Sequence, residues 1–239
     1  MIKKALVTGS ASGIGRAIAL DLAVKGFDVA FHYNHSAEAA NQASQQAATH
    51  GIKSIALQAD VTKPEQAQSL VENAAEKLGG LSVVVNNVGN YLEKPTSEIS
   101  VEEWHQMLDS NLNATFYVTQ ATIPYFKAAG WGRIVNFAFA SAQHTIAGEV
   151  ETAYRIAKTG IIIYTKSLAK ELILDNITAN VVSPGVAENS VGLEETIPIL
   201  PAKRPATVQD ISNAVCFFIS PEADYITGQV MEVAGGWRL

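Results

Sequence analysis

Short apolar runs alternate with longer amphipathic segments along the whole chain. Continuous apolar runs are typical of parallel strands that are buried on both faces of a sheet. They predict strands at 4–8, 28–33, 54–59, 81–87, 133–139, 178–183 and 229–236. The amphipathic segments predict helices at 13–25, 37–50, 62–78, 101–108, 112–129, 153–175 and 208–220. This alternation predicts an α/β chain with one doubly wound, seven-stranded parallel sheet and helices on both of its faces.

Two segments carry additional signals. Thr62 is expected to cap the third helix, with Pro64 in its first turn. Prolines interrupt the segment 188–205, which is expected to form a short irregular flap. No repeat, low-complexity tract or linker divides residues 1–239, so they are expected to form a single domain.

Composition narrows the class of function. The chain has 239 residues, of which 48% are hydrophobic and 17% are charged, which is typical of a globular protein with a sizeable core. Its net charge of −6 argues against nucleic-acid binding, because phosphate-binding surfaces are usually basic. The chain has one cysteine, which excludes an intrachain disulfide. We recognise no signal peptide and no apolar stretch of membrane-spanning length, so we expect no membrane partner and a cytoplasmic location.

A glycine-rich stretch, TGSASGIG at 8–15, lies between the first predicted strand and the first predicted helix. Glycines permit a tight turn and a close approach of the backbone to a ligand. The helix that follows would direct its N-terminus at a pyrophosphate. The stretch therefore predicts dinucleotide binding on a Rossmann-type fold, although an ordinary strand-to-helix turn is the alternative.

The spacing of Gly9, Gly13 and Gly15 gives G-x-x-x-G-x-G, which resembles the short-chain dehydrogenase/reductase family. Further landmarks of that family follow in order along nearly the whole chain. They are DVT at 60–62, NNVG at 86–89 where the family usually has NNAG, Asn111 in SNLNATF, a Y-x-x-x-K motif, SPG at 183–185, and the ending YITGQVMEVAGG. The resemblance implies an NAD(P)-dependent enzyme that reduces a ketone to a secondary alcohol. It implies no metal ion.

Tyr154 and Lys158 form the Y-x-x-x-K motif and share one face of a predicted helix. The pair could be an ordinary half-exposed surface pair. Hydride transfer to a ketone, however, leaves an alkoxide that needs a proton, which a tyrosine can donate. A nearby ammonium favours the phenolate and is expected to lower the pKa of Tyr154. The resemblance also implies that Lys158 holds the nicotinamide ribose and that Asn111 completes a proton relay through water.

The serine that polarises the substrate carbonyl in this family is displaced here. RIVNFAFAS places Ala138 and Phe139 at the usual serine positions. Ser141 lies thirteen residues before Tyr154, which is a usual family separation, so we predict Ser141 as this residue, after a two-residue extension or bulge. The alternative is that Ser141 is a plain loop serine and the site lacks its polarising group. Arg155 is expected to be solvated or at a subunit contact.

The end of the second strand indicates the cofactor. Family members that prefer NAD carry an acid there, which bonds the ribose 2′-hydroxyl. This chain has Tyr33, followed by Asn34, His35 and Ser36, which favours NADP(H). Ser12 stands where many relatives have arginine; Arg16 and His35 are possible substitutes. The full set of predicted cofactor-binding residues is Gly9, Ser10, Ser12, Gly13, Ile14, Gly15, Tyr33, Asn34, His35, Ser36, Asp60, Val61, Asn87, Gly89, Tyr154, Lys158, Pro184, Gly185 and Ala187.

The layout most resembles 3-oxoacyl-[acyl-carrier-protein] reductases, which predicts an acyl-thioester or other small ketone as substrate. Similar layouts serve sugar, steroid, pteridine and quinone reductases. Lys203 and Arg204 are candidates for docking a carrier protein, with a solvated surface pair as the alternative. Asn189 stands where many relatives have a threonine that bonds the nicotinamide carboxamide. A different class of function is a nucleotide-binding regulatory or structural protein with impaired catalysis. The resemblance also implies a homotetramer or homodimer, with which an ending that exposes Trp237 and Leu239 would agree.

Overall fold

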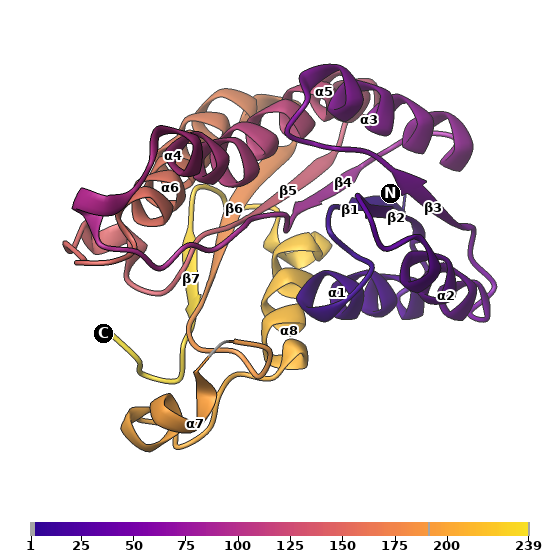
Figure 1. The fold of residues 1–239 in the computed structure, drawn as a ribbon. Coiled ribbons are helices and arrows are strands. Elements are labelled where there is room, and N and C mark those ends of the chain that lie inside the picture. Colours follow the sequence, from indigo (N-terminus) through magenta and orange to yellow (C-terminus); the bar gives the residue numbers. More distant parts are fainter. Residues whose placement is uncertain (1–2, 191, 239) are drawn as a thin grey trace.

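The computed structural model describes residues 3–190 and 192–238. Its strands form one parallel sheet in the order β3-β2-β1-β4-β5-β6-β7 (Figure 1). The seven strands in the described residues are β1 Lys4–Val7, β2 Asp28–Tyr33, β3 Ser54–Gln58, β4 Val83–Asn86, β5 Gly132–Phe137, β6 Ile177–Pro184 and β7 Val230–Val233. The predicted seven-stranded parallel sheet is confirmed.

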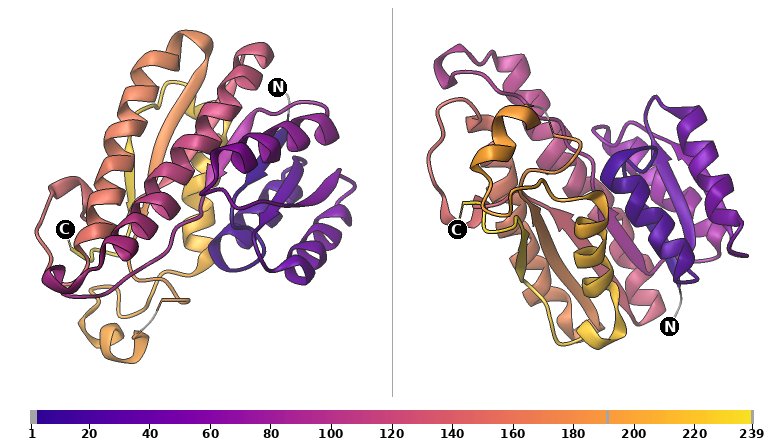
Figure 2. Two further views of the ribbon diagram at one scale, coloured as in Figure 1. Left: turned by 45° about the horizontal axis from the view of Figure 1, so that its top comes forward. Right: turned by 90° about the horizontal axis from the view of Figure 1, so that it is seen from below.

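Two layers of helices cover the sheet (Figures 1 and 2). One layer contains α1 Gly13–Val24, α2 Ala37–Ala48 and α8 Val208–Ile219. The other contains α3 Pro64–Leu78, α4 Val101–Leu108, α5 Ala114–Ala129 and α6 Thr152–Leu172. Each layer packs against its own buried apolar cluster, which includes Phe31 on one side and Phe126 on the other. The fold is therefore doubly wound, as the sequence predicts.

Three local predictions differ from the structure. Lys63, not Thr62, precedes the first turn of α3, because Thr62 donates its N–H and O–H to Asp60 Oδ1 at 3.0 and 2.7 Å. The helix expected from residue 112 begins at Ala114, after a five-residue π-helix at Asp109–Asn113. The flap is partly helical, with α7 at Leu193–Thr196 and a 3₁₀ turn at Ile197–Ile199. It projects from the sheet edge in the left view of Figure 2.

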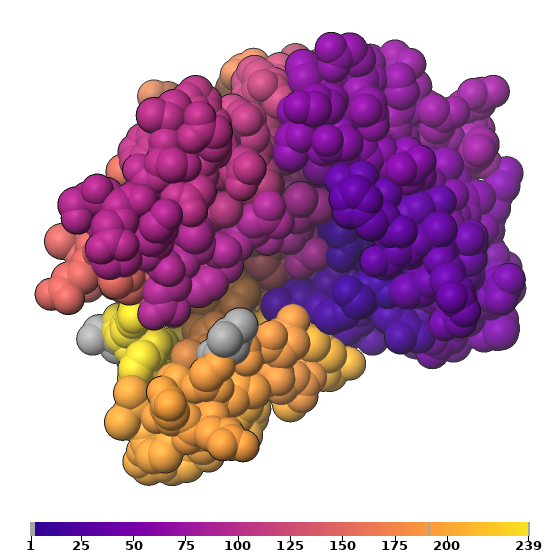
Figure 3. Space-filling view, in the orientation of Figure 1, coloured from indigo at the N-terminus to yellow at the C-terminus, as the bar shows by residue number. Residues whose placement is uncertain are grey.

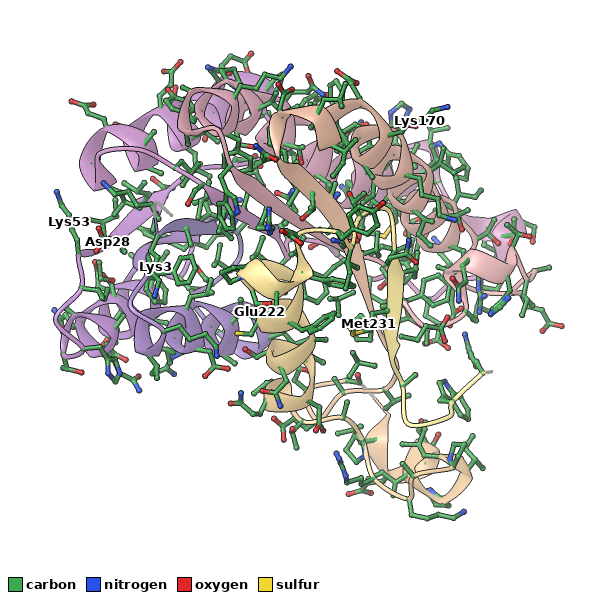
Figure 4. The ribbon with its side chains drawn as sticks, turned by 180° about the vertical axis from the view of Figure 1, so that it is seen from behind. Lys3, Asp28, Lys53, Lys170, Glu222 and Met231 are labelled. Atoms are coloured by element: carbon green, nitrogen blue, oxygen red, sulfur yellow. The ribbon has the colours of Figure 1, made fainter. Side chains whose placement is uncertain are left out.

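Because all strands are parallel, their amino ends lie along one edge of the sheet and their carboxyl ends along the opposite edge. Asp28 begins β2, and its Oδ1 accepts the backbone N–H of Lys53, just before β3, at 2.7 Å. Both residues lie with Lys3 at the amino-terminal edge (Figure 4). The carboxyl ends of the strands therefore meet at the opposite edge, where ligands bind in open α/β sheets. None of the helices in the described part of the chain is long and apolar enough to cross a membrane.

Candidate active site

The predicted cofactor residues follow the carboxyl ends of successive strands. The glycine-rich turn follows β1, Tyr33 ends β2, Asp60 follows β3 and Asn87 follows β4. Residues 184–187 lie at the end of β6 and just after it. Figure 3 shows a hollow in the surface at this edge, between the magenta segment that follows β4 and the orange flap. The predicted residues therefore gather at one edge of the sheet.

The glycine-rich turn has the geometry of a phosphate cradle. Gly9 and Gly13 adopt the left-handed region, with φ of 62° and 55°. A Cβ at Gly15 would lie 2.3 Å from the carbonyl oxygen of Gly9, so only glycine allows α1 to begin this close to the turn. Within the described residues, no side chain caps the first N–H groups of α1. Ser12 is exposed and Ile14 is half-buried. These N–H groups fit a pyrophosphate.

Two polar side chains brace this turn from inside. Asn87 Nδ2 donates to the carbonyl oxygens of Thr8 and Gly9, each at 3.1 Å. Ser10 is fully buried, and its Oγ donates to the carbonyl oxygen of Val7 at 2.8 Å. Ser10 and Asn87, both predicted to bind cofactor, therefore use these donors within the protein.

The residues that lead from β2 into α2 are those predicted to decide between NADP(H) and NAD(H). Tyr33 and Asn34 are half-buried, whereas His35 and Ser36 are exposed. His35 and Ser36 line an open depression of about 510 Å³ together with Gln42 of α2. No carboxylate occurs between Tyr33 and Ser36, so nothing in this stretch repels a 2′-phosphate.

Charged side chains near the depression already have partners. Glu38 also lines it, and its Oε1 accepts Gln42 Nε2 at 3.2 Å. Arg16 Nη2 donates to Gln46 Oε1 of α2 at 3.0 Å. Of the two candidate partners for a 2′-phosphate, His35 is therefore the one that lines the depression.

Asp60 and Val61 follow β3. Val61 is buried. Asp60 Oδ1 accepts both hydrogen bonds from Thr62, which lower the pKa of the Asp60 carboxyl. Asp60 is therefore ionised and held in one orientation at neutral pH.

Lys158 and Asn111 lie together beside Gly89, and Tyr154 lies next to Lys158. Lys158 is buried and its Nζ donates to the carbonyl oxygen of Phe137 at 3.1 Å. A Cβ at Gly89 would lie 3.2 Å from Lys158 Nζ and 2.3 Å from Asn111 Oδ1. Lys158 Nζ also lies 5.6 Å from the ring centroid of Tyr154. Only glycine at position 89 leaves room for this arrangement.

Asn111 lies in the π-helix between α4 and α5. Its Nδ2 donates to the carbonyl oxygens of Asn90 and Met107, at 2.9 and 3.0 Å. Its Oδ1 is buried and has no hydrogen-bond partner among the described residues. Single turns of π-helix occur frequently at functional sites. The amide orientation leaves one acceptor free beside Lys158.

The protonation of the Tyr154–Lys158 pair differs from the sequence prediction. Burial and the nearby Glu151 raise the pKa of Tyr154 to about 12, although we expected Lys158 to lower it. Burial also lowers the pKa of Lys158 to about 8. Desolvation disfavours the charged form of both groups. The phenol is consequently protonated at neutral pH, which is the form that donates a proton.

The segment after β5 is extended rather than bulged. The N–H groups of Ala138 and Ala140 donate to the carbonyl oxygens of Val182 and Pro184, at 3.0 and 2.8 Å. Regular pairing with β6 therefore continues through Ala140. Ser141 then turns into the left-handed region, with φ of 72°.

Ser141 is buried at the start of the following turn. Its N–H donates to Glu232 Oε1 of β7 at 2.9 Å. Its Oγ is buried and has no partner among the described residues. From this segment Phe139 contacts the ring of Tyr154, with the centroids 5.6 Å apart. Ser141 thus has a free hydroxyl, whereas Phe139 occupies the space beside the phenol ring.

Arg155, expected to be solvated or at a subunit contact, is half-buried. Its Nη2 lies 2.5 Å from Glu151 Oε2, and its guanidinium lies 5.1 Å from the ring centroid of Phe139. Its Nη1 donates to the carbonyl oxygen of Ile146 at 3.3 Å. Arg155 therefore ties the start of α6 to the loop before it.

The segment after β6 approaches both β7 and the glycine-rich turn. A Cβ at Gly185 would lie 2.9 Å from the Cα of Ala234, just after β7. Ala187 is buried and its N–H donates to Ser190 Oγ at 3.0 Å. A Cβ at Gly13 would lie 3.1 Å from Asn189 Nδ2, so the base of the flap reaches the turn.

Sequence reasoning missed two residues that the structure places beside the site. His32 of β2 bonds to the glycine-rich turn, and Glu232 of β7 bonds to Ser141. The available signal was a polar residue inside an otherwise apolar strand, in AFHY and in VMEV. The described residues contain no cluster of histidine, cysteine, aspartate and glutamate that could hold a metal ion.

Comparisons with known proteins give one family. The family model described as "Enoyl-(Acyl carrier protein) reductase" matches residues 9–238. The chain is 35% identical over 243 residues to the 3-oxoacyl-[acyl-carrier-protein] reductase FabG of Staphylococcus aureus. The match covers 99% of this chain and 98% of that protein. Two solved crystal structures also resemble this chain, at 32% and 33% sequence identity.

One is acetoin dehydrogenase YohF from Salmonella typhimurium, with a TM-score of 0.91, 32% identity, and coverage of 99% of this chain and 96% of that one. The other is a blue fluorescent protein from a metagenomic library in complex with NADPH, with a TM-score of 0.91, 33% identity, and coverage of 99% and 98%. The chain therefore belongs to the short-chain dehydrogenase/reductase family and is an NAD(P)-dependent oxidoreductase.

Proposed function

We propose that this enzyme uses NADPH to reduce a ketone to a secondary alcohol, and that its substrate resembles that of 3-oxoacyl-[acyl-carrier-protein] reductases. The observation that carries the proposal is that Lys158 and Asn111 lie together beside Gly89, with Tyr154 next to Lys158 and the phosphate cradle nearby. The uncapped start of α1 and the free acceptor of Asn111 fit a bound nicotinamide cofactor. Turnover of NADPH with a ketone, measured by absorbance, tests the proposal.

The proposed mechanism assigns a separate task to each side chain. The bound cofactor supplies the hydride. The Ser141 hydroxyl donates to the carbonyl oxygen and stabilises its developing charge. Tyr154 donates its phenolic proton to that oxygen as the alkoxide forms. Lys158 holds the ribose hydroxyls, and Asn111 Oδ1 accepts from a water that restores the proton on Tyr154.

The pKa of Tyr154 supports the direction of reduction. A pKa raised to about 12 keeps the phenol protonated throughout the neutral range. Reduction needs the phenol, whereas oxidation of an alcohol needs the phenolate. At neutral pH the phenol is therefore in the form that ketone reduction uses.

The preference for NADPH rests on the end of β2. Tyr33 stands where an acid would bond the ribose 2′-hydroxyl, and His35 and Ser36 line the neighbouring depression. No carboxylate occurs between Tyr33 and Ser36, and a 2′-phosphate can accept hydrogen bonds from these side chains; the carboxylate that lines the depression is that of Glu38 in α2, which is hydrogen-bonded to Gln42. The NADPH-bound structure among the similar proteins agrees with this preference.

Replacing Tyr33 by aspartate should reverse the preference. The ratio of kcat/KM for NADPH to that for NADH should fall about tenfold or more, since like charges repel a 2′-phosphate and an acid can bond a 2′-hydroxyl. Tyr33→Asn is the matched control, because it removes the same ring without adding charge, and should keep the NADPH preference. Equal ratios in the wild type and Tyr33→Asp would contradict the assignment of this position.

The cationic side chains bear on whether the substrate ketone is free or attached to an acidic carrier protein. Arg204 Nη1 lies 2.6 Å from Asp210 Oδ2, and Lys203 Nζ donates to the carbonyl oxygen of Pro198. Lys94, whose backbone bonds to the loop before α6, is paired with Glu103 at 2.8 Å. Because Arg204 and Lys94 are already paired with carboxylates, we favour a free acyl thioester or small ketone over one on an acidic carrier protein. Equal or faster turnover of the carrier-bound thioester would reverse that choice.

Phe139 supports a second candidate function. It packs against Tyr154 at a position where the family usually has its serine. A nucleotide-binding regulatory protein with impaired catalysis would explain that replacement. Tight NADPH binding without turnover on any ketone would favour this function.

We further propose that residues 1–239 act as one dinucleotide-binding oxidoreductase domain with a substrate flap at about 188–205, of which residue 191 lies outside the described part.

We propose assembly into a homotetramer or homodimer. Phe116 of α5 and Ile156 and Ile163 of α6 expose large apolar side chains that a second copy would cover. Trp237 is half-buried, and Leu239 lies outside the described residues. Sedimentation should show an oligomer at micromolar concentration; a monomer would contradict this proposal.

A further inference from the structure

His32 is a buried histidine in the strand next to the glycine-rich turn. It lies in β2, between β1 and β3, and is 1% exposed. The backbone N–H of Gly9 donates to its Nδ1 at 3.0 Å. Its Nε2 lies 3.0 Å from the carbonyl oxygen of Ala59. An N–H can only donate and a carbonyl can only accept, so Nδ1 is unprotonated and Nε2 carries the proton.

The backbone of His32 strengthens the same connection. Its carbonyl oxygen accepts the N–H of Ser10 at 2.9 Å. Its N–H donates to Ser10 Oγ at 2.9 Å, and that hydroxyl donates to Val7. The first two residues of the turn after Thr8 are thus fixed to one strand residue.

The imidazole ring joins two parts of the cofactor site. Gly9 opens the turn that follows β1 and has a left-handed φ of 62°. Ala59 immediately precedes Asp60, whose carboxylate is fixed by Thr62. The ring therefore sets the distance between the turn and Asp60. Burial lowers the pKa of His32, which favours the neutral form that these two hydrogen bonds require.

We propose that His32 is a positioning residue for NADPH, which acts through its Nδ1 by holding the Gly9 N–H and thereby the glycine-rich turn. The inference rests on the proposed binding of the cofactor at this turn. It assigns no contact between His32 and the cofactor. Its expected effect is on cofactor affinity and not on the chemical step.

Two substitutions separate the two ring nitrogens. The Oδ1 of an asparagine can take the place of Nδ1, so His32→Asn keeps an acceptor for Gly9 and loses the donor to Ala59. The Nε2 of a glutamine can take the place of the ring Nε2, so His32→Gln keeps that donor and loses the acceptor. Both variants remove one buried hydrogen bond, so each serves as the stability control for the other.

NADPH binding is measured by fluorescence titration without any ketone, so an incorrect substrate assignment does not affect the result. His32→Gln should weaken binding about tenfold, and His32→Asn should stay within about threefold of the wild type. With saturating cofactor, kcat of both variants on any accepted ketone should stay within about threefold of the wild type.

Equal losses of affinity in the two variants, or no loss in either, would overturn the proposal. A fall in kcat with unchanged affinity would also overturn it. Should His32→Gln fail to fold, His32→Leu, which removes both ring nitrogens, takes its place: a tenfold loss in His32→Leu beside wild-type affinity in His32→Asn supports the role of Nδ1, and equal affinities in the two variants refute it. A wild-type protein that binds no NADPH would instead contradict the proposed function.

Discussion

Replacing Tyr154 by phenylalanine should lower kcat for ketone reduction by about a thousandfold or more. The change removes the phenolic oxygen and retains the ring, which packs between Tyr91 and Phe139. NADPH affinity should therefore stay within about threefold of the wild type, because the fold and the glycine-rich turn are untouched. Steady-state kinetics and a fluorescence titration measure the two quantities on the same preparation.

Tyr91→Phe is the matched control for this substitution. Tyr91 makes an edge contact with the Tyr154 ring at 5.2 Å between centroids, and its hydroxyl lies within hydrogen-bond distance of the carboxylates of Glu93 and Glu151, at 3.3 and 3.2 Å. Removal of that hydroxyl should leave most of the activity, because it is not the assigned proton donor. A Tyr154→Phe enzyme that kept more than about a tenth of the wild-type kcat would show that another group supplies the proton.

The raised pKa of Tyr154 has a pH consequence. The phenol is the active form in reduction and is present below its pKa of about 12, so loss of this proton should not slow reduction between pH 6 and 8. The phenolate is the active form in alcohol oxidation, so that rate should rise with pH throughout this range. Rates in both directions over the range provide the measurement. A reduction rate that falls with pH along a tyrosine titration would contradict the assigned protonation state.

The second large effect is expected at Ser141. Ser141→Ala should lower kcat about a hundredfold, because a single donor at a developing oxyanion contributes factors of this size. Cofactor affinity should not change, since the Ser141 N–H can still donate to Glu232. Steady-state kinetics at saturating NADPH measure the loss.

Ser183→Ala controls for the loss of a buried hydroxyl. Ser183 lies in β6, is fully buried, and has an Oγ that, like that of Ser141, finds no hydrogen-bond partner among the described residues. This control should leave kcat nearly unchanged. Unchanged kcat in Ser141→Ala would mean that Ser141 does not polarise the carbonyl. A gain of activity in Phe139→Ser would then place that role at position 139.

Local patterns in the sequence predict most of the helices and strands. The strand at 28–33 was predicted with its observed bounds because Asp28 and the turn after Tyr33 delimit an apolar run. The π-helix around Asn111 could not be predicted in this way, since it depends on how α4 and α5 join against the core. Thr62 was misassigned because its preference for an N-cap gave way to two hydrogen bonds with Asp60.

The site was only partly accessible from the sequence. Helical spacing and family motifs placed Tyr154 and Lys158 together, but spacing says nothing of burial, which reversed the expected shift of the tyrosine pKa. The expectation that Arg155 is solvated or at a subunit contact did not include its contacts with Glu151, one turn earlier, and with the ring of Phe139. The sequence did not indicate roles for His32 and Glu232, because their hydrogen-bond partners, Gly9 and Ser141, are distant in the chain.

The central claim is that this chain is a working NADPH-dependent ketone reductase. Its most direct test follows the absorbance of NADPH and NADH in parallel, with acetoacetyl thioesters, diketones, quinones and pterins as substrates. We predict that with at least one ketone the enzyme consumes NADPH faster than NADH, and that Tyr154→Phe abolishes this consumption. Tight NADPH binding without consumption on any of these ketones would contradict the account and favour a nucleotide-binding protein with impaired catalysis.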